Sequence, residues 1–323
     1  MTATTEGLAE TGPDTAEGGK TSRTAAIWTL IITGLALFMT SLDNLVVGVA
    51  LPSIQSDFGG TIESLEWTVN AYTLAFAVLL ITGAAMGDRF GRRRMFAVGV
   101  GLFTAASAAA ALAPSLDALI IARAIQGAGA AMVTPLTLTL VSGAFPPEKR
   151  GAALGIWGGI SGLGVALGPL FGGAVVEGIS WHWIFWLNVP VGLVLVPLAL
   201  RRLPESTGPD KALDLRGLVL VGAGLFGLTF GIIRGESLGW TSTPVLASLI
   251  TGVVMLAAFV AWELRAREPM LPMRFFRSRG FSATNGLSFA MFFGTFGAIF
   301  LLSQFFQVAQ GLGPLDAGIR TLP

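Results

Sequence analysis

Nine long apolar runs constrain this chain more than any other feature of its sequence. Each is long enough to cross a hydrocarbon core, which takes about 17 to 25 helical residues. Only 12% of the 323 residues are charged and 53% are hydrophobic, whereas a soluble domain carries about 25% charged residues. The sequence therefore predicts an all-α transmembrane protein. The predicted spans are 27–50, 67–87, 95–112, 119–142, 153–176, 184–200, 217–235, 244–263 and 281–305.

The basic residues indicate the direction in which the chain crosses the membrane. Lysine and arginine collect on the cytoplasmic side of membrane proteins. With the N-terminus inside, all of the 20 basic residues except Arg123, Arg234 and Arg320 fall in cytoplasmic segments. We therefore predict a multi-pass protein of the cell (plasma) membrane with a cytoplasmic N-terminus. Residues 1–22 are small and polar, and they are predicted to be a disordered cytoplasmic tail.

The composition also excludes several kinds of site. The chain has no cysteine and one histidine, His182, so it offers no thiolate nucleophile and no cluster of cysteine or histidine metal ligands. No phosphate-binding loop, nucleophile–base set or pore ring is visible, which argues against an enzyme or a channel. We expect no cofactor and no metal. The net charge of +1 gives no indication of a nucleic-acid partner, and none is expected.

A short charged turn separates the second and third apolar runs. Residues 87–94 read Gly-Asp-Arg-Phe-Gly-Arg-Arg-Arg, and so many charges must leave the hydrocarbon. The pattern resembles the loop 2–3 signature of the major facilitator superfamily of secondary transporters, although Ala84 stands where that family usually has glycine. The resemblance implies that this turn acts as an inner gate. The residues of the implied gate are Asp88, Arg89, Gly91, Arg92 and Arg93.

The first apolar run contains an acid, Asp43. A carboxylate at the centre of a span costs about 2.5–3.5 kcal/mol on insertion scales, so such a residue usually faces a cavity or an ionic partner. Alternatively, Asp43 lies close enough to the predicted exit at Pro52 to reach outer water. The stretch from Leu42 to Pro52 resembles the first-helix motif of drug:proton antiporters. This resemblance implies that Asp43 binds a proton or a cationic substrate.

The fourth apolar run contains a cation, Arg123. A guanidinium stays protonated, so a buried Arg123 needs an anionic or carbonyl partner, unless it snorkels to the outer interface. The stretch Arg123-x-x-Gln126-Gly127-x-Gly129 resembles the superfamily's fourth-helix motif, which implies roles for Arg123 and Gln126 in proton coupling. Asp43 and Arg123 each lack another obvious opposite charge. We therefore expect the two to influence each other, directly or through water.

The fifth apolar run is rich in glycine and contains a proline. Small residues four apart let membrane helices approach closely, and a proline removes a backbone hydrogen bond and favours a kink. Close packing alone would explain the glycines. The full pattern also resembles the antiporter motif of exporters in the superfamily. Its matching residues are Gly164, Gly168, Pro169, Gly172 and Gly173.

The prediction of domains has two grounds. One is the charged loop at 201–216, and the other is a resemblance to the fourteen-span drug:proton antiporter branch. In that branch, two extra helices separate two six-helix halves. The resemblance implies a C-terminally truncated chain, which we do not expect to transport alone. The implied parts are the tail 1–22, an N-terminal six-helix bundle 23–200, a cytoplasmic loop 201–216, two extra membrane helices 217–263, and an inner-face linker with the first helix of an incomplete second bundle 264–323.

The function implied by the resemblance is export of small amphipathic compounds or drugs in exchange for protons. Asp43 is expected to bind a proton or cationic group near a central cavity. The expected partners are a small hydrophobic or cationic substrate, protons and the lipid bilayer. Two alternatives stay open: a nutrient or metabolite symporter of the same superfamily, and a truncated fragment that transports nothing.

Overall fold

The computed structural model describes residues 23–208, 214–266, 269, 271–312 and 320. Across these residues the regular structure is entirely helical, which confirms the predicted all-α transmembrane class. The predicted tail at 1–22 lies outside the described residues, as does 209–213 of the predicted loop. The helices are α1 (Arg23–Phe58), α2 (Ile62–Phe90), α3 (Arg92–Ala111), α4 (Leu116–Ala144), α5 (Pro147–Gly178), α6 (His182–Trp186), α7 (Asn188–Arg202), α8 (Leu215–Leu238), α9 (Thr243–Glu263), η1 (Met273–Arg277), α10 (Arg279–Gln304) and η2 (Phe305–Ala309).

Eight of the nine predicted runs form segments long and apolar enough to cross a membrane. The sixth of these segments is built from two helices, α6 and α7, which are separated by Leu187. The ninth run, 281–305, is helical as α10. Because α10 is not among the eight candidate spans of the described residues, its crossing stays a prediction.

Capping side chains mark the starts of three of the helices. Thr61 and Ser115 accept backbone N–H bonds at the starts of α2 and α4, and Asp214 does the same for α8. Such side-chain oxygens satisfy donors that the first helical turn leaves without partners. Gly91 joins α2 to α3 with φ of +105°, a conformation that glycine adopts readily. The chain can therefore reverse direction in one residue.

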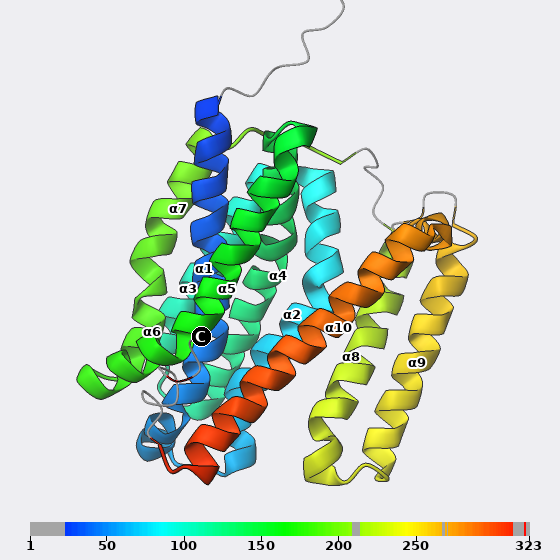
Figure 1. The fold of residues 1–323 in the computed structure, drawn as a ribbon. Helices are drawn as coiled ribbons and strands as arrows, with labels where there is room; N and C mark the ends of the chain where they lie inside the picture. The colour runs from blue at the N-terminus through cyan, green and yellow to red at the C-terminus, as the bar shows by residue number, and fades with distance from the viewer. Residues whose placement is uncertain (1–22, 209–213, 267–268, 270, 313–319, 321–323) are drawn as a thin grey trace, which may run out of the picture.

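Helices α1–α7 pack into one bundle, and α8 and α9 form a hairpin beside α2 (Figure 1). Two apolar cores lie within the bundle. One surrounds Phe96 and Phe103 and includes Leu203, and the other surrounds Ile184 and Phe185. We call the end where α1 begins and the 87–94 turn lies the basic end.

The extra hairpin and α10 differ in how they pack. Glycines hold α8 and α9 together: a Cβ added to Gly227 would lie 2.7 Å from the Ser248 carbonyl oxygen, and one added to Gly252 would lie 2.6 Å from the Leu228 nitrogen. The main contacts of α10 are with its flanking turns η1 and η2. Most of its described side chains are exposed, as at Phe293, which is 76% exposed.

Candidate functional site

The central feature of the bundle is a buried ion pair between α1 and α4. Arg123 Nη1 donates to Asp43 Oδ2 at 2.5 Å, and the two side chains are 0% and 1% exposed. The expected interaction between these residues is therefore confirmed as a direct contact. The two alternatives, an acid that reaches outer water and an arginine that snorkels to the interface, are wrong because neither side chain reaches the surface.

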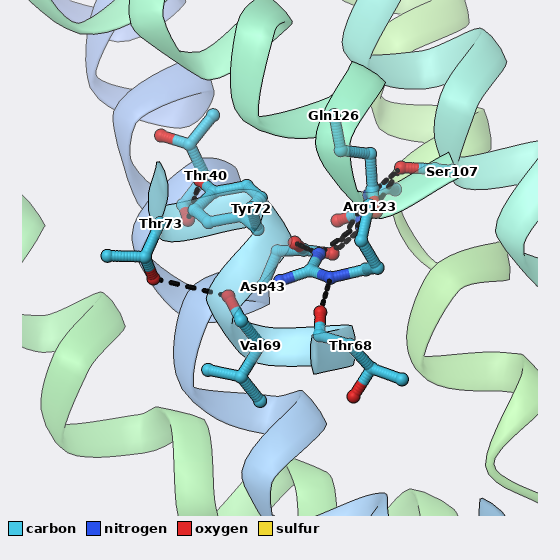
Figure 2. A network of polar contacts seen from close by, with 10 residues as sticks. Thr40, Asp43, Thr68, Val69, Tyr72, Thr73, Ser107, Arg123 and Gln126 are labelled. Atoms are coloured by element: carbon cyan, nitrogen blue, oxygen red, sulfur yellow. Dashed lines mark hydrogen bonds and ion pairs between the residues drawn. The ribbon is translucent and has the colours of Figure 1, made fainter. Parts of the chain in front are cut away.

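Arg123 has further partners on α2 and α4. Its Nε donates to the Thr68 carbonyl oxygen at 2.9 Å, and its Nη1 also donates to Gln126 Oε1 at 2.9 Å. The guanidinium lies 4.3 Å from the centre of the Tyr72 ring, at a distance typical of a cation–π contact. Figure 2 shows Arg123 enclosed by Asp43, Thr68 and Tyr72. Arg123 therefore has three partners besides Asp43: the Thr68 carbonyl oxygen, Gln126 and the Tyr72 ring.

The second oxygen of Asp43 is held by two amides. Oδ1 accepts from Asn188 Nδ2 at 2.7 Å and from Gln126 Nε2 at 3.2 Å. Gln126 also donates to Ser107 Oγ at 2.7 Å. A buried carboxylate is tolerated when a cation and further donors satisfy its lone pairs. Asp43, Arg123 and Gln126, which were predicted from separate helices, therefore belong to one network.

Asn188 and Ser107 were missed by the sequence analysis. Ser107 is a single hydroxyl in an alanine-rich stretch of α3, and Asn188 begins α7 directly after the α6 break. Both are buried. An amide at the start of an apolar run was a signal for Asn188, because a polar side chain in a span needs a partner. Ser107 gave no comparable signal.

The network occupies a polar layer between the two apolar cores. Along α1, Asp43 follows Met39 of one core and precedes Val46 of the other. The Asp43 carboxylate is 1% exposed, so it is enclosed by protein in this conformation, and a central cavity near it stays a prediction. A cavity of about 330 Å³ lies elsewhere. It is lined by Leu51, Glu66, Val69, Asn70 and Ile233.

The charged turn at the basic end forms a second cluster. Asp88 and Arg92 make an ion pair of 2.8 Å across Gly91, and Arg89 lies over the Phe90 ring at 5.3 Å. The Arg93 backbone N–H donates to Glu205 Oε1 at 3.0 Å. The side chains of this cluster are partly exposed, so solvent screens their charges more than those of the buried pair.

The segment 203–208, which follows α7, is hydrogen-bonded to this turn through the backbone. The Arg92 N–H donates to the Ser206 carbonyl oxygen and the Gly208 N–H to the Asp88 carbonyl oxygen, both at 2.8 Å. A Cβ on Gly208 would lie 2.5 Å from Asp88 Cβ, so the approach requires glycine. The proposed gate residues of the turn were predicted from the sequence, whereas Glu205 and Gly208, which contact the turn from the loop, were not.

The glycine motif of α5 packs against the stretch of α1 that carries Asp43. A Cβ on Gly164 would lie 2.9 Å from Ser41 Cβ, one on Gly168 would lie 2.9 Å from Leu45 Cβ, and one on Gly172 would lie 3.3 Å from Val46 Cγ1. The predicted close helix approach is therefore confirmed. Gly173 is also buried, and Pro169 lies inside a helix that continues through it.

The described residues offer no metal site, because no three histidine, aspartate or glutamate side chains gather among them. The polar layer instead contains a fixed cation, one carboxylate and neutral amide and hydroxyl groups.

Comparison with known proteins identifies the family of this chain. A model of the Major Facilitator Superfamily matches residues 33–321. The chain is 37% identical over 297 residues to the tetracenomycin C resistance and export protein of Streptomyces glaucescens, and 40% identical over 297 residues to the multidrug resistance protein Stp of Mycobacterium tuberculosis. Each alignment covers 91% of this chain and 55% of the relative. The chain thus spans about half the length of these relatives.

The fold also matches a solved structure. A peptide transporter of the POT family, crystallised with sulfate, superposes with a TM-score of 0.55 at 17% identity, over 74% of this chain and 52% of that chain. The names of the two relatives describe resistance or export and no enzyme activity. The match of the family model across nearly all of the described bundle shows that this chain belongs to the Major Facilitator Superfamily.

Proposed function

We propose that this protein is a secondary active transporter that exports small amphipathic compounds in exchange for protons, in the manner of the fourteen-span drug:proton antiporters. The observation that carries the proposal is the Asp43–Arg123 pair, a titratable acid buried against a permanent cation. An intramembrane ionisable pair is expensive to keep and usually functional. The relatives named for drug resistance and export support the direction of transport.

The coupling step follows from the hydrogen bonds of the pair. Oδ1 of Asp43 accepts from Asn188 and Gln126, and Oδ2 accepts from Arg123. A proton that binds Oδ2 therefore displaces the Arg123 N–H and removes the charge that attracts Arg123. Arg123 then keeps its bonds to the Thr68 carbonyl oxygen and Gln126. Because α1 and α4 lose their ionic contact, protonation alters the balance between two packings of the bundle, as alternating access requires.

Two further motifs are proposed to take part in this movement, the charged turn at the basic end of the bundle and the glycine motif of α5. In the proposal, the turn residues Asp88, Arg89, Gly91, Arg92 and Arg93 form a gate at the basic end, which faces the cytoplasm. The α5 motif, Gly164, Gly168, Pro169, Gly172 and Gly173, provides the surface along which α1 and α5 stay in contact. Both roles rest on the packing described above and on the resemblance of the motifs.

The substrate is proposed to be hydrophobic or cationic, and the membrane to be the plasma membrane with the N-terminus inside. The names of the two relatives, one for tetracenomycin C and one for multiple drugs, support a drug-like substrate. The concentration of arginine at the basic end supports the orientation.

Everted membrane vesicles containing the full-length protein test the direction and the coupling. With ethidium as a cationic amphipathic probe, an acidic lumen should drive ethidium inward, and a protonophore should abolish the uptake. Vesicles with Asp43→Asn should show no gradient-driven uptake. A nutrient-type symporter gives the opposite result, because preloaded ethidium would leave the acidic lumen together with protons. Ethidium movement that ignores the gradient would contradict proton coupling.

A further inference from the structure

A second cavity lies at the basic end of the α8–α9 hairpin, outside the bundle that holds the polar layer. It has a volume of about 470 Å³ and is lined by Leu215, Arg216, Val219, Leu220 and Trp262. Leu215 and Val219 are 65% and 68% exposed. The cavity is therefore an open apolar groove with one cation in its wall.

The cation and the aromatic ring of this groove are held together. Trp262 Nε1 donates to Asp214 Oδ2 at 2.7 Å, and Asp214 Oδ1 accepts the Gly217 N–H at 2.9 Å, which caps α8. The Arg216 guanidinium lies 5.1 Å from the centre of the Trp262 ring. Asp214, the N-cap of α8, thus fixes Trp262 of α9, and the Arg216 guanidinium packs against the Trp262 ring.

The charge of Arg216 is not neutralised by a carboxylate in the part of the chain that the structure describes. The comparison is Arg234, at the other end of α8, which lies over Trp67 in the same way but also makes an ion pair with Glu63. Two acids close to the groove have other partners. Asp214 accepts from Trp262 Nε1 and from the Gly217 N–H, and Glu263 Oε2 accepts from the Leu271 N–H. Arg216 is exposed beside the groove.

We propose that this groove binds an anionic phospholipid of the leaflet at the basic end. The lipid phosphate pairs with Arg216, and one acyl chain lies along Leu215, Val219 and Leu220 against Trp262. Tryptophan and arginine collect at the depth of the lipid headgroups, and a basic side chain there favours anionic over zwitterionic lipid. The apolar wall distinguishes a lipid from a free phosphate ion. The site does not depend on the transport mechanism proposed above.

Fluorescence quenching in nanodiscs tests the proposal. The signal of Trp262 is isolated as the difference between the unmodified protein and Trp262→Phe, and brominated phosphatidylglycerol or brominated phosphatidylcholine is added in increasing mole fraction. Brominated phosphatidylglycerol should quench Trp262 at a mole fraction about fivefold lower. In an Arg216→Gln background the two lipids should quench equally. Arg265→Gln, a nearby exposed arginine outside the groove, should keep the preference.

Two more measurements separate a bound phospholipid from a free anion at the same arginine. Val219→Phe, which fills the groove without adding a tryptophan, should reduce quenching by both lipids, and circular dichroism should show that the variants keep their helical content. Inorganic phosphate should leave quenching by phosphatidylglycerol unchanged. Equal quenching by the two lipids in the unmodified protein, or a preference that survives Arg216→Gln, would overturn the proposal. Displacement by inorganic phosphate would overturn it too, because the groove would then be a simple anion site.

Discussion

The six-span bundle and the α8–α9 hairpin use the same amino acids in different ways. Both contain an arginine over an aromatic ring and paired with an acid. In the bundle, Arg123 and Asp43 are fully buried, whereas in the contact between α2 and the hairpin, the side chain of Glu63 is 48% exposed and that of Arg234 is 23% exposed. Both regions also pack helices through glycine, at Gly168 and at Gly227.

The difference lies in what surrounds each pair. The buried carboxylate has lost its hydration, so its charge depends on Arg123, Asn188 and Gln126, and losing one partner leaves an expensive charge behind. The exposed pair can exchange protein contacts for water, so its loss costs little. We therefore expect the proton-dependent step to take place in the bundle. The ion pair of the hairpin is expected to have a structural role only.

The largest effect is expected from removing one partner of the buried pair. Arg123→Gln leaves the Asp43 carboxylate buried without its cation, which should lower the free energy of unfolding by about 3–5 kcal/mol. Thermal or denaturant unfolding in detergent, followed by circular dichroism, measures the change. Arg265→Gln, an exposed arginine, is the matched control. Equal stability of the two variants would show that the buried pair is not needed to hold the bundle.

The double variant Asp43→Asn with Arg123→Gln sharpens the same comparison. Removing both charges leaves neither one unpaired, so the double variant should be destabilised by less than the sum of the single variants. For residues in contact, the interaction energy in such a cycle is about 0.5–3 kcal/mol. Strictly additive single effects would contradict an energetic contact between α1 and α4.

A smaller effect is expected from filling the glycine contact on which α1 rests. Gly168→Leu forces a side chain against Leu45, and overpacking of this kind costs about 1–3 kcal/mol. Gly101→Leu is the control, because a Cβ there meets only Val196 Cγ2 at an ordinary 3.9 Å. Unfolding midpoints and ethidium export should both fall for Gly168→Leu alone. Equal tolerance would remove the α5 motif from the packing of α1.

The smallest effect is expected at the exposed pair. Arg234→Gln should change the free energy of unfolding by less than about 1 kcal/mol, since exposed ion pairs contribute little and solvent screens them. The effect should shrink further in high salt. A loss as large as that of Arg123→Gln would show that the two regions do not differ in the way that their burial indicates.

Much of the fold was predictable because each span carries its own signal. A long apolar run, a basic turn and a helix cap are local, so eight spans and the turn at Asp88 could be found from the sequence. Asp43 and Arg123 could be paired because intramembrane charges are few and need partners.

The neighbours of these residues could not be predicted. Which face of α3 or α7 turns toward Asp43 depends on packing between helices far apart in the sequence, so Ser107 and Asn188 were missed. The contact of Glu205 with the basic turn depends on the path of a loop. The glycines of the hairpin did carry a signal that was not used: Gly227, Gly231 and Gly235 stand four apart on α8, a spacing that favours close helix packing.

Proton movement that depends on substrate tests the central claim most directly. Full-length protein is reconstituted in liposomes with a pH-sensitive dye in the lumen, and ethidium is then added. The account predicts saturable, ethidium-dependent proton flux in the unmodified protein and in Glu63→Gln, and none in Asp43→Asn that retains its helical content. Unchanged proton flux in Asp43→Asn would contradict the account, since the buried carboxylate would then have no part in coupling.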